Sequence, residues 1–131
     1  MQHSAREDNV SNIFGEYLKQ LRLSRKLTLR LFCEANGFDP GNYSKIERGV
    51  LQPPKDEQKL DVYRRAFNLH PKSEEWRDLQ NLASISRGEI PYRVLINHIA
   101  VANLPALFRT LENSCISPEN FDKVIDILQG Q

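Results

Sequence analysis

Two short helical segments joined by a glycine turn constrain the fold most strongly. Residues 28–49 read TLRLFCEANGFDPGNYSKIERG. Thr28 is a suitable N-cap for a short helix, and Gly37 can take the left-handed backbone conformation that ends such a helix. Asp39 followed by Pro40 then favours the start of a second helix. This stretch therefore predicts two short helices connected by a tight turn.

Most of the remaining chain also predicts helices. Apolar side chains recur at the three- and four-residue spacing of an amphipathic helix, and capping residues precede several of these segments. The expected helices cover about residues 12–24, 56–67, 73–87, 104–113 and 117–128. Residues 91–103 favour a short helix over a strand, because no second strand is evident to pair with them. We therefore expect an all-α protein.

Charge and periodicity divide the chain into three parts. Residues 1–10 are polar and aperiodic, which predicts a flexible tail. Residues 11–70 hold 11 Lys and Arg against 7 Asp and Glu, whereas residues 71–131 hold 6 against 8. A basic first half and an acidic second half are typical of a protein whose first half meets a polyanion. We expect a boundary between the two halves near residue 70.

The pattern of residues 28–49 resembles the XRE family of phage-repressor-like helix-turn-helix proteins. The resemblance covers about residues 13–69, and residues 44–49 carry its most specific part. It implies a five-helix DNA-binding domain over residues 11–70, followed by a small C-terminal helical region. In a helix-turn-helix, the first helix braces on the DNA backbone and the second lies in the major groove. The resemblance also implies a structural ion pair between Arg22 and Glu47.

The resemblance places base-reading positions near the start of the second helix of the motif. These positions are Pro40, Gly41, Asn42, Ser44 and Lys45. Pro40 and Gly41 carry no group that can hydrogen-bond a base edge. Direct readout would therefore rest on Asn42, which can pair with adenine, and on Lys45, which can reach guanine, with Ser44 in support.

Phosphate contacts are expected around the first helix of the motif. The glutamine that the family commonly uses to grip a phosphate is replaced here by Leu29. These contacts would then come from the backbone N–H groups at the helix start and from the side chains of Thr28, Lys26, Arg30 and Arg48. The alternative for Lys26 and Arg30 is a solvated surface with no contact to DNA.

Two apolar stripes lie in residues 71–131. The stripe residues are Leu104, Leu107, Phe108 and Leu111, followed by Phe121, Val124, Ile125 and Leu128. They can either close a small subdomain or form a dimer interface. We favour the dimer, because a lone helix-turn-helix makes few base contacts, whereas a two-fold dimer doubles them across paired half-sites.

The sequence indicates no catalytic or metal site. His3, His70 and His98 lie far apart with no cysteine or carboxylate cluster near them, and Cys33 and Cys115 fit no metal-ligand spacing. We therefore expect a non-enzymatic protein without a cofactor or a bound metal. No apolar run approaches the roughly 20 residues of a membrane span, and no signal peptide is evident, so we expect a cytoplasmic protein with reduced thiols.

Three functional hypotheses follow from these patterns. The leading hypothesis is a transcriptional regulator, a repressor that binds double-stranded DNA as a homodimer on a palindromic operator. The second is an antitoxin-like DNA-binding protein whose residues 71–131 bind and neutralise a basic protein partner. The third is an adaptor that keeps the fold but binds only protein.

Overall fold

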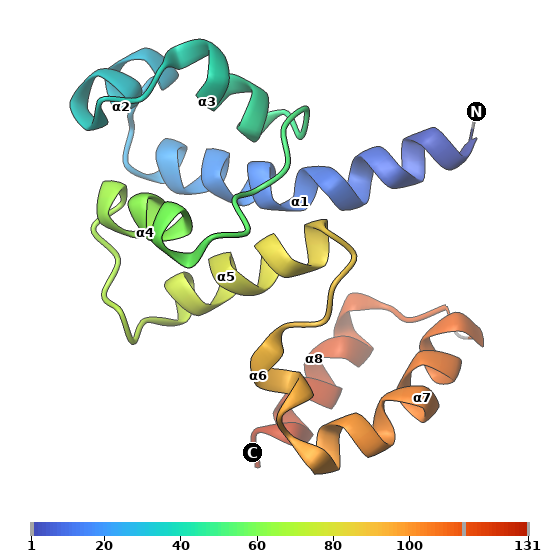
Figure 1. Ribbon diagram of the computed structural model, residues 1–131. Coiled ribbons are helices and arrows are strands. Elements are labelled where there is room, and N and C mark those ends of the chain that lie inside the picture. The colour runs from blue at the N-terminus through green and yellow to red at the C-terminus, as the bar shows by residue number, and fades with distance from the viewer. Residues whose placement is uncertain (1, 114, 131) are drawn as a thin grey trace. The chain divides into compact units, whose positions relative to one another are not determined.

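The computed structural model describes residues 2–113 and 115–130, with side chains from residue 12 onward (Figure 1). This part of the chain contains eight α-helices and no strand, which confirms the all-α prediction. The helices are α1 (Gln2–Ser24), α2 (Leu29–Asn36), α3 (Pro40–Glu47), α4 (Glu57–Ala66), α5 (Glu74–Ser86), α6 (Tyr92–Leu95), α7 (His98–Asn113) and α8 (Pro118–Leu128). They fall into two compact units, unit 1 (Met1–Pro91) and unit 2 (Tyr92–Gln131).

The boundary between the units lies after Pro91, so the boundary predicted near residue 70 is wrong. Helix α5 packs against α1, and its side chains Trp76, Leu79 and Ala83 are buried in the core of unit 1. An apolar stripe shows that a helix needs a partner but does not say which one. Here the partner of α5 lies N-terminal to it, and unit 2 begins only with α6.

Capping side chains fix the ends of the central helices as the sequence predicts. The Thr28 hydroxyl accepts a hydrogen bond from the N–H of Leu31 at 3.1 Å, and Gly37 ends α2 with a φ of 69°. The Asp39 carboxylate accepts from the N–H of Asn42 at 2.9 Å, at the start of α3. Asp56, Ser73 and Ser117 likewise cap the starts of α4, α5 and α8.

Two helices begin earlier than their sequences predicted. Helix α1 begins at Gln2 rather than near Asn12, because residues 2–11 contain no glycine or proline that would stop the helix. The flexible tail predicted over residues 1–10 is therefore wrong from Gln2 onward, where the backbone is helical. Helix α7 begins at His98, where Asn97 accepts a hydrogen bond from the N–H of Ala100 at 3.0 Å. Pro105, predicted to open this helix, lies inside it and removes a single backbone donor.

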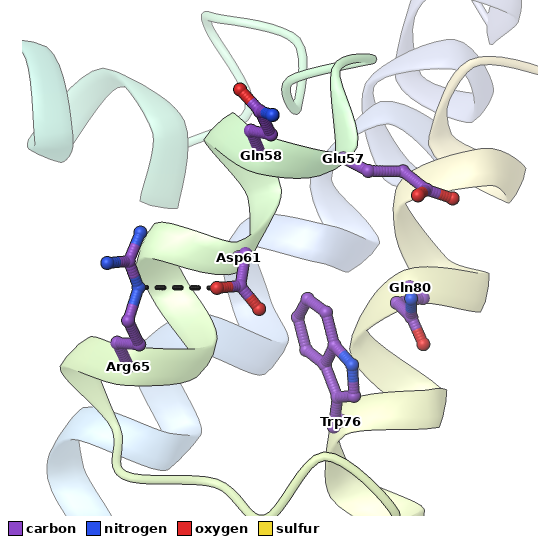
Figure 2. Close-up of a pocket in the computed structure, with 6 residues that line it drawn as sticks. All are labelled: Glu57, Gln58, Asp61, Arg65, Trp76 and Gln80. Carbon is purple, nitrogen blue, oxygen red and sulfur yellow. Dashed lines mark ion pairs between the residues drawn. The ribbon is translucent and has the colours of Figure 1, made fainter.

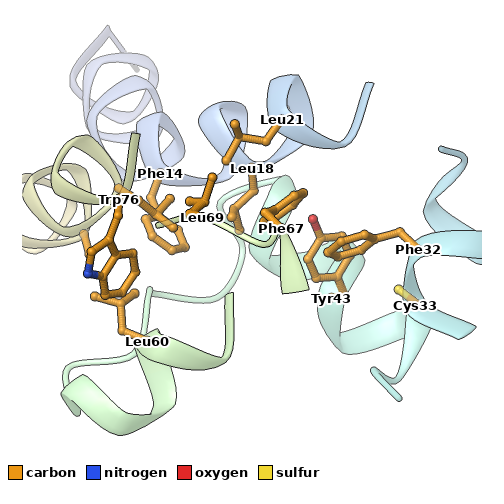
Figure 3. Packing of buried hydrophobic residues seen from close by; sticks show 12 residues of the cluster. Phe14, Leu18, Leu21, Phe32, Cys33, Tyr43, Leu60, Phe67, Leu69 and Trp76 are labelled. Atoms are coloured by element: carbon orange, nitrogen blue, oxygen red, sulfur yellow. The ribbon is translucent and has the colours of Figure 1, made fainter. Parts of the chain in front are cut away.

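The core of unit 1 joins all five of its helices (Figure 3). Phe14 and Leu18 of α1 lie at 1% and 0% exposure, and Leu79 of α5 at 0%. The Phe32 ring of α2 stacks on Phe67 with 4.6 Å between ring centroids. Burying a side chain of this size stabilises the fold by roughly 1.5–3 kcal/mol, so the core holds α2 and α3 in place.

Unit 2 consists of α6, α7 and α8, and α6 contacts α7. None of its described residues is buried, in contrast to unit 1. Unit 2 therefore lacks an enclosed core over its described residues.

Candidate nucleic-acid interface

Helices α2 and α3 are held together by the turn between them and by aromatic packing. The N–H of Phe38 donates to the carbonyl of Cys33 at 2.9 Å, which closes the end of α2. The rings of Phe32 and Tyr43 lie 5.1 Å apart, and both side chains are buried. The inner sides of the two helices are therefore fixed, and their outer sides remain open to a ligand.

Helix α3 has one buried side and one exposed side. Tyr43 and Glu47, one turn apart, are 3% and 6% exposed and point into the unit. The positions predicted to read bases lie elsewhere on the helix. Of these, Pro40, Gly41, Asn42 and Lys45 are exposed, and Ser44 is half-buried. The structure thus brings the predicted reading residues together on the accessible side of one helix.

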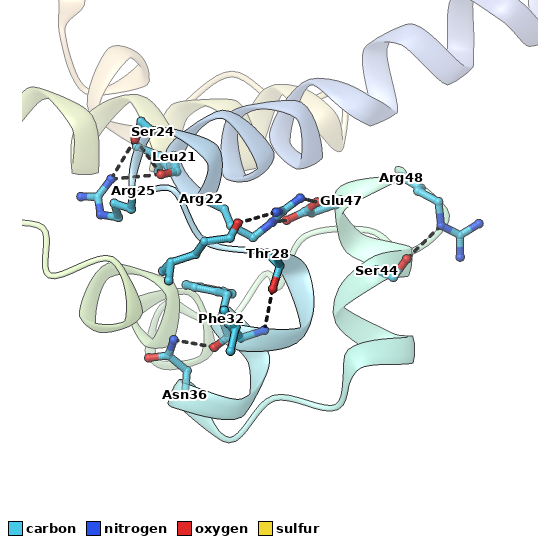
Figure 4. Close-up of polar contacts among 12 residues, drawn as sticks. Leu21, Arg22, Ser24, Arg25, Thr28, Phe32, Asn36, Ser44, Glu47 and Arg48 are labelled. Atoms are coloured by element: carbon cyan, nitrogen blue, oxygen red, sulfur yellow. Dashed lines mark hydrogen bonds and ion pairs between the residues drawn. The ribbon is translucent and has the colours of Figure 1, made fainter.

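Ser44 contacts another predicted DNA-binding residue. Its hydroxyl accepts a hydrogen bond from the Nε of Arg48 at 3.2 Å (Figure 4). Arg48 itself is exposed just beyond the end of α3. Ser44 can therefore hold the guanidinium of Arg48 in place, a role that differs from the base contact expected of it.

The predicted phosphate-binding residues surround the start of α2. Thr28 is exposed, and its oxygen already caps the helix, which leaves the hydroxyl proton free to be donated. Lys26 is exposed and takes a left-handed backbone conformation with a φ of 57°. Arg30 is exposed in the first turn of α2. The start of α2 therefore combines positive charge with exposed hydrogen-bond donors.

A buried ion pair joins α1 to the end of α3, at the two positions that the resemblance implied. The Nε of Arg22 donates to Glu47 Oε2 at 2.8 Å, and Nη2 donates to Oε1 at 3.0 Å (Figure 4). Nη1 donates to the carbonyl of Leu27 at 2.8 Å, just before α2 begins. The hydrogen bonds to Glu47 raise the pKa of Arg22. One guanidinium therefore ties together α1, α3 and the turn before α2.

Gly15 is a positioning residue that the sequence analysis missed. It is buried on α1, and a Cβ at this position would lie 2.3 Å from the carbonyl oxygen of Ile46 and 2.4 Å from that of Glu47. The backbones of α1 and α3 are therefore in direct contact. The signal was present, because an isolated glycine inside a predicted helix often marks a close approach.

Comparison with known proteins gives no match: no family model, no curated protein and no solved structure matches the chain. The site is therefore identified from its own residues.

The charge of the exposed surface suits a polyanion. Lys26, Arg30, Lys45 and Arg48 are exposed on α2, α3 and the turns beside them. The exposed acids of the same stretch are Glu34 and Asp39, and the carboxylate of Asp39 caps α3. Glu47 is buried and neutralised by its ion pair. The exposed groups thus carry a net positive charge that favours contact with phosphates.

A separate hollow of about 490 Å³ lies between α4 and α5 (Figure 2). It is lined by Glu57, Gln58, Asp61, Arg65, Trp76 and Gln80. Hydrogen bonding to Arg64 lowers the pKa of Asp61, which also pairs with Arg65 at 3.2 Å. The central acid of this hollow is therefore already engaged with two arginines.

Among the described residues, no group of three or more His, Cys, Asp or Glu side chains is placed to hold a metal ion. No described helix is both long and apolar enough to cross a membrane. Cys33 and Cys115 are both free thiols, the first buried and the second exposed.

Proposed function

We propose that the chain is a sequence-specific DNA-binding transcriptional regulator in which α2 and α3 act as a helix-turn-helix of the XRE kind. One observation carries the proposal. Helix α3 buries Tyr43 and Glu47 against the core, while Asn42 and Lys45 on the same helix are exposed. Polar side chains on the open side of a rigidly held helix are what major-groove readout needs.

The dimensions of α3 suit this role. An α-helix with its side chains is about 10–12 Å in diameter, and the eight residues of α3 give it a length of about 12 Å. The major groove is about 12 Å wide and accepts one helix. With α3 in the groove, Asn42 would bond an adenine edge and Lys45 a guanine edge. Pro40 and Gly41, having no long side chains, would let the start of the helix approach the bases closely.

The phosphate contacts would come from both ends of the motif. Arg48, held by Ser44, lies beyond the C-terminal end of α3. Thr28, Lys26 and Arg30 lie at the start of α2, whose free N–H groups also favour a phosphate oxygen. These contacts set the orientation of α3, and the base contacts set the sequence preference.

A regulator of this kind would act on paired sites. One α3 contacts only a few base pairs, so two copies on half-sites about 34 Å apart would double the contacts and raise the specificity. The operator would then be a palindrome, and occupancy of such a site next to a promoter would repress transcription.

The proposal is tested by selecting binding sites from a random pool of DNA duplexes with the full-length protein. We expect recovery of an inverted repeat whose half-sites are centred about one helical turn apart. Lys45→Ala should change or abolish the recovered sequence, while Lys72→Ala, an exposed lysine outside α2 and α3, should recover the parent sequence. A pool that shows no enrichment after several rounds would contradict the proposal.

A further inference from the structure

A further hollow, of about 650 Å³, lies beside the candidate reading helix. Residues of α3 and α4 line it, together with Leu51 of the loop between these helices, so it lies within unit 1. We call it the α3–α4 hollow. Small-molecule sites are commonly concave regions of about 300–1,000 Å³ with apolar walls and a few polar groups. The α3–α4 hollow has this size, and the proposed function leaves it without a role.

Three aromatic rings line the α3–α4 hollow. The rings of Phe38 and Tyr43 are stacked with 5.7 Å between their centroids, and the ring of Tyr63 lies 5.7 Å from Phe38 and 6.5 Å from Tyr43. Ile46 and Leu51 add aliphatic surface, and Leu51 is 40% exposed. Aromatic rings about 4.5–7 Å apart attract each other beyond the gain from burying their surface. The walls therefore favour a ligand that carries an aromatic ring.

Lys59 of α4 gives the hollow a free positive charge. It lines the hollow and is exposed, and within residues 12–113 and 115–130 no acid forms an ion pair with it. Asp39 also lines the hollow, but its carboxylate accepts a hydrogen bond from the N–H of Asn42 at the positive N-terminal end of α3, which offsets its charge. The charge left for a ligand is therefore the ammonium of Lys59, which favours a carboxylate.

Asn42 belongs both to the α3–α4 hollow and to the candidate reading surface. The hollow is lined by Asn42, Tyr43 and Ile46 of α3, which the helical period places along one side of that helix. The side-chain amide of Asn42 has one carbonyl oxygen and one amino group, and a bidentate contact with adenine uses both. A ligand in the hollow that bonds this amide therefore competes with DNA for it.

We propose that the α3–α4 hollow binds a small aromatic carboxylate, with its ring against Phe38 and Tyr63 and its carboxylate on Lys59. The bound ligand engages Asn42 and thereby lowers the affinity of the protein for DNA. The ligand site depends only on the residues of unit 1, whereas the effect on DNA rests on the proposed function. Because coupling between two binding sites is reciprocal, DNA lowers the affinity for the ligand by the same factor.

The first test titrates the isotope-labelled full-length protein with indole-3-acetate in the absence of DNA and follows the amide signals by NMR. We expect a Kd of about 1 mM or tighter for a ligand of this size. The signals that move should include the backbone N–H groups of Gly37, Phe38 and Leu51 and the side-chain amide of Asn42. Indole-3-acetamide, which has nearly the same shape and no charge, should bind at least about tenfold more weakly.

Three outcomes of this titration would overturn the proposal. The first is the absence of any shift at these residues up to about 10 mM indole-3-acetate, roughly ten times the expected Kd. The second is equal binding of indole-3-acetamide, because Lys59 would then have no role. The third is tighter binding of tryptamine than of indole-3-acetate, because Asp39 and not Lys59 would then hold the charged group.

A matched pair of lysine variants assigns the charge. Lys59→Met should lower the affinity for indole-3-acetate at least about tenfold, to the level of indole-3-acetamide. Lys72→Met, which changes an exposed lysine outside the hollow, should bind indole-3-acetate as the parent does. The fluorescence of the buried Trp76 in the ligand-free variants checks that unit 1 remains folded. Unchanged affinity in Lys59→Met would overturn the proposal.

The effect on DNA is measured with a duplex recovered by selection. Saturating indole-3-acetate should raise the Kd for this duplex at least about tenfold in the parent and in Lys72→Met, with potassium acetate at equal ionic strength as the control. At the same concentration it should leave the Kd of Lys59→Met nearly unchanged. Ligand binding without any change in DNA affinity would overturn the competition for Asn42.

Failure of the proposed function and failure of the ligand site give different results. If no duplex binds, the proposed function is wrong, while the titration still decides whether indole-3-acetate enters the hollow and moves the Asn42 amide. If Lys59→Met weakens binding to every duplex and indole-3-acetate moves no signal, Lys59 contacts the DNA backbone and the ligand proposal is overturned.

Discussion

The ion pair of Arg22 with Glu47 makes the most quantitative prediction about stability. Both residues are nearly buried, at 7% and 6% exposure, and share two hydrogen bonds of 2.8 and 3.0 Å. Arg22→Ala removes both bonds and the donor to the Leu27 carbonyl, and leaves a buried carboxylate without a partner. Breaking such a pair on one side costs about 3–5 kcal/mol. At about 4–8 °C per kcal/mol for a small domain, the Tm of unit 1 should fall by roughly 10–40 °C.

Thermal unfolding followed by the fluorescence of Trp76 measures this change, because the indole is buried in unit 1. Arg65→Ala is the control: its pair with Asp61 lies at the surface, with the Arg65 side chain 65% exposed, and should contribute less than about 1 kcal/mol. The double variant Arg22→Met with Glu47→Leu should be more stable than Arg22→Ala, because no unpaired charge remains. A Tm for Arg22→Ala within about 3 °C of the parent would refute the reasoning.

Three further predictions address readout, packing and pH. Asn42→Ala should cost about 1–3 kcal/mol of binding free energy at one base pair and relax the sequence preference there. Arg48→Ala should weaken binding to all sequences and reduce the slope of log binding constant against log salt concentration by about one unit. Salt-dependent binding curves on matched and mismatched duplexes distinguish the two effects. Gly15→Ala should abolish folding of unit 1 as judged by Trp76 fluorescence, because its Cβ would meet backbone at 2.3 Å, whereas Gly41→Ala would meet only the Asp39 side chain at 3.3 Å and should leave the fold intact. Burial raises the pKa of Tyr43 above its ordinary value of 10.0, and the nearby Glu47 carboxylate adds to this shift. The contribution of Tyr43 to stability is therefore full below pH 10.0 and is lost as the pH rises beyond it. Tyr43→Phe should move the midpoint of alkaline unfolding to higher pH, and an unchanged midpoint would count against this cause.

Local signals in the sequence predicted the central helices well. Thr28, Gly37 and Asp39 act through hydrogen bonds or backbone angles within a few residues, so the ends of α2 and α3 could be predicted from their immediate neighbours. The start of α1 could not, because the residues before position 11 are polar and show no apolar periodicity that would predict a helix. The unit boundary was also missed, since only the folded chain shows that α5 packs against α1.

The candidate site was predictable where it depends on local sequence patterns. Helical periodicity and the family resemblance placed Asn42 and Lys45 on one helix, and the structure shows both exposed. The bond between Ser44 and Arg48 depends on the side-chain conformation of two flexible residues, which periodicity does not specify. The isolated glycine at position 15 could mark a close approach, but its partner at the end of α3 lies about 30 residues further along the chain, and local rules do not identify that partner.

The central claim is that α3 reads base edges in the major groove, and methylation interference on a selected duplex tests it most directly. Methylation of guanine at N7 blocks the major-groove edge, whereas methylation of adenine at N3 blocks the minor-groove edge. We predict loss of binding from N7 methylation in two patches about one helical turn apart, and a weaker N7 effect in Lys45→Ala than in the parent. Interference confined to adenine N3, or an N7 pattern unchanged in Lys45→Ala, would contradict the account.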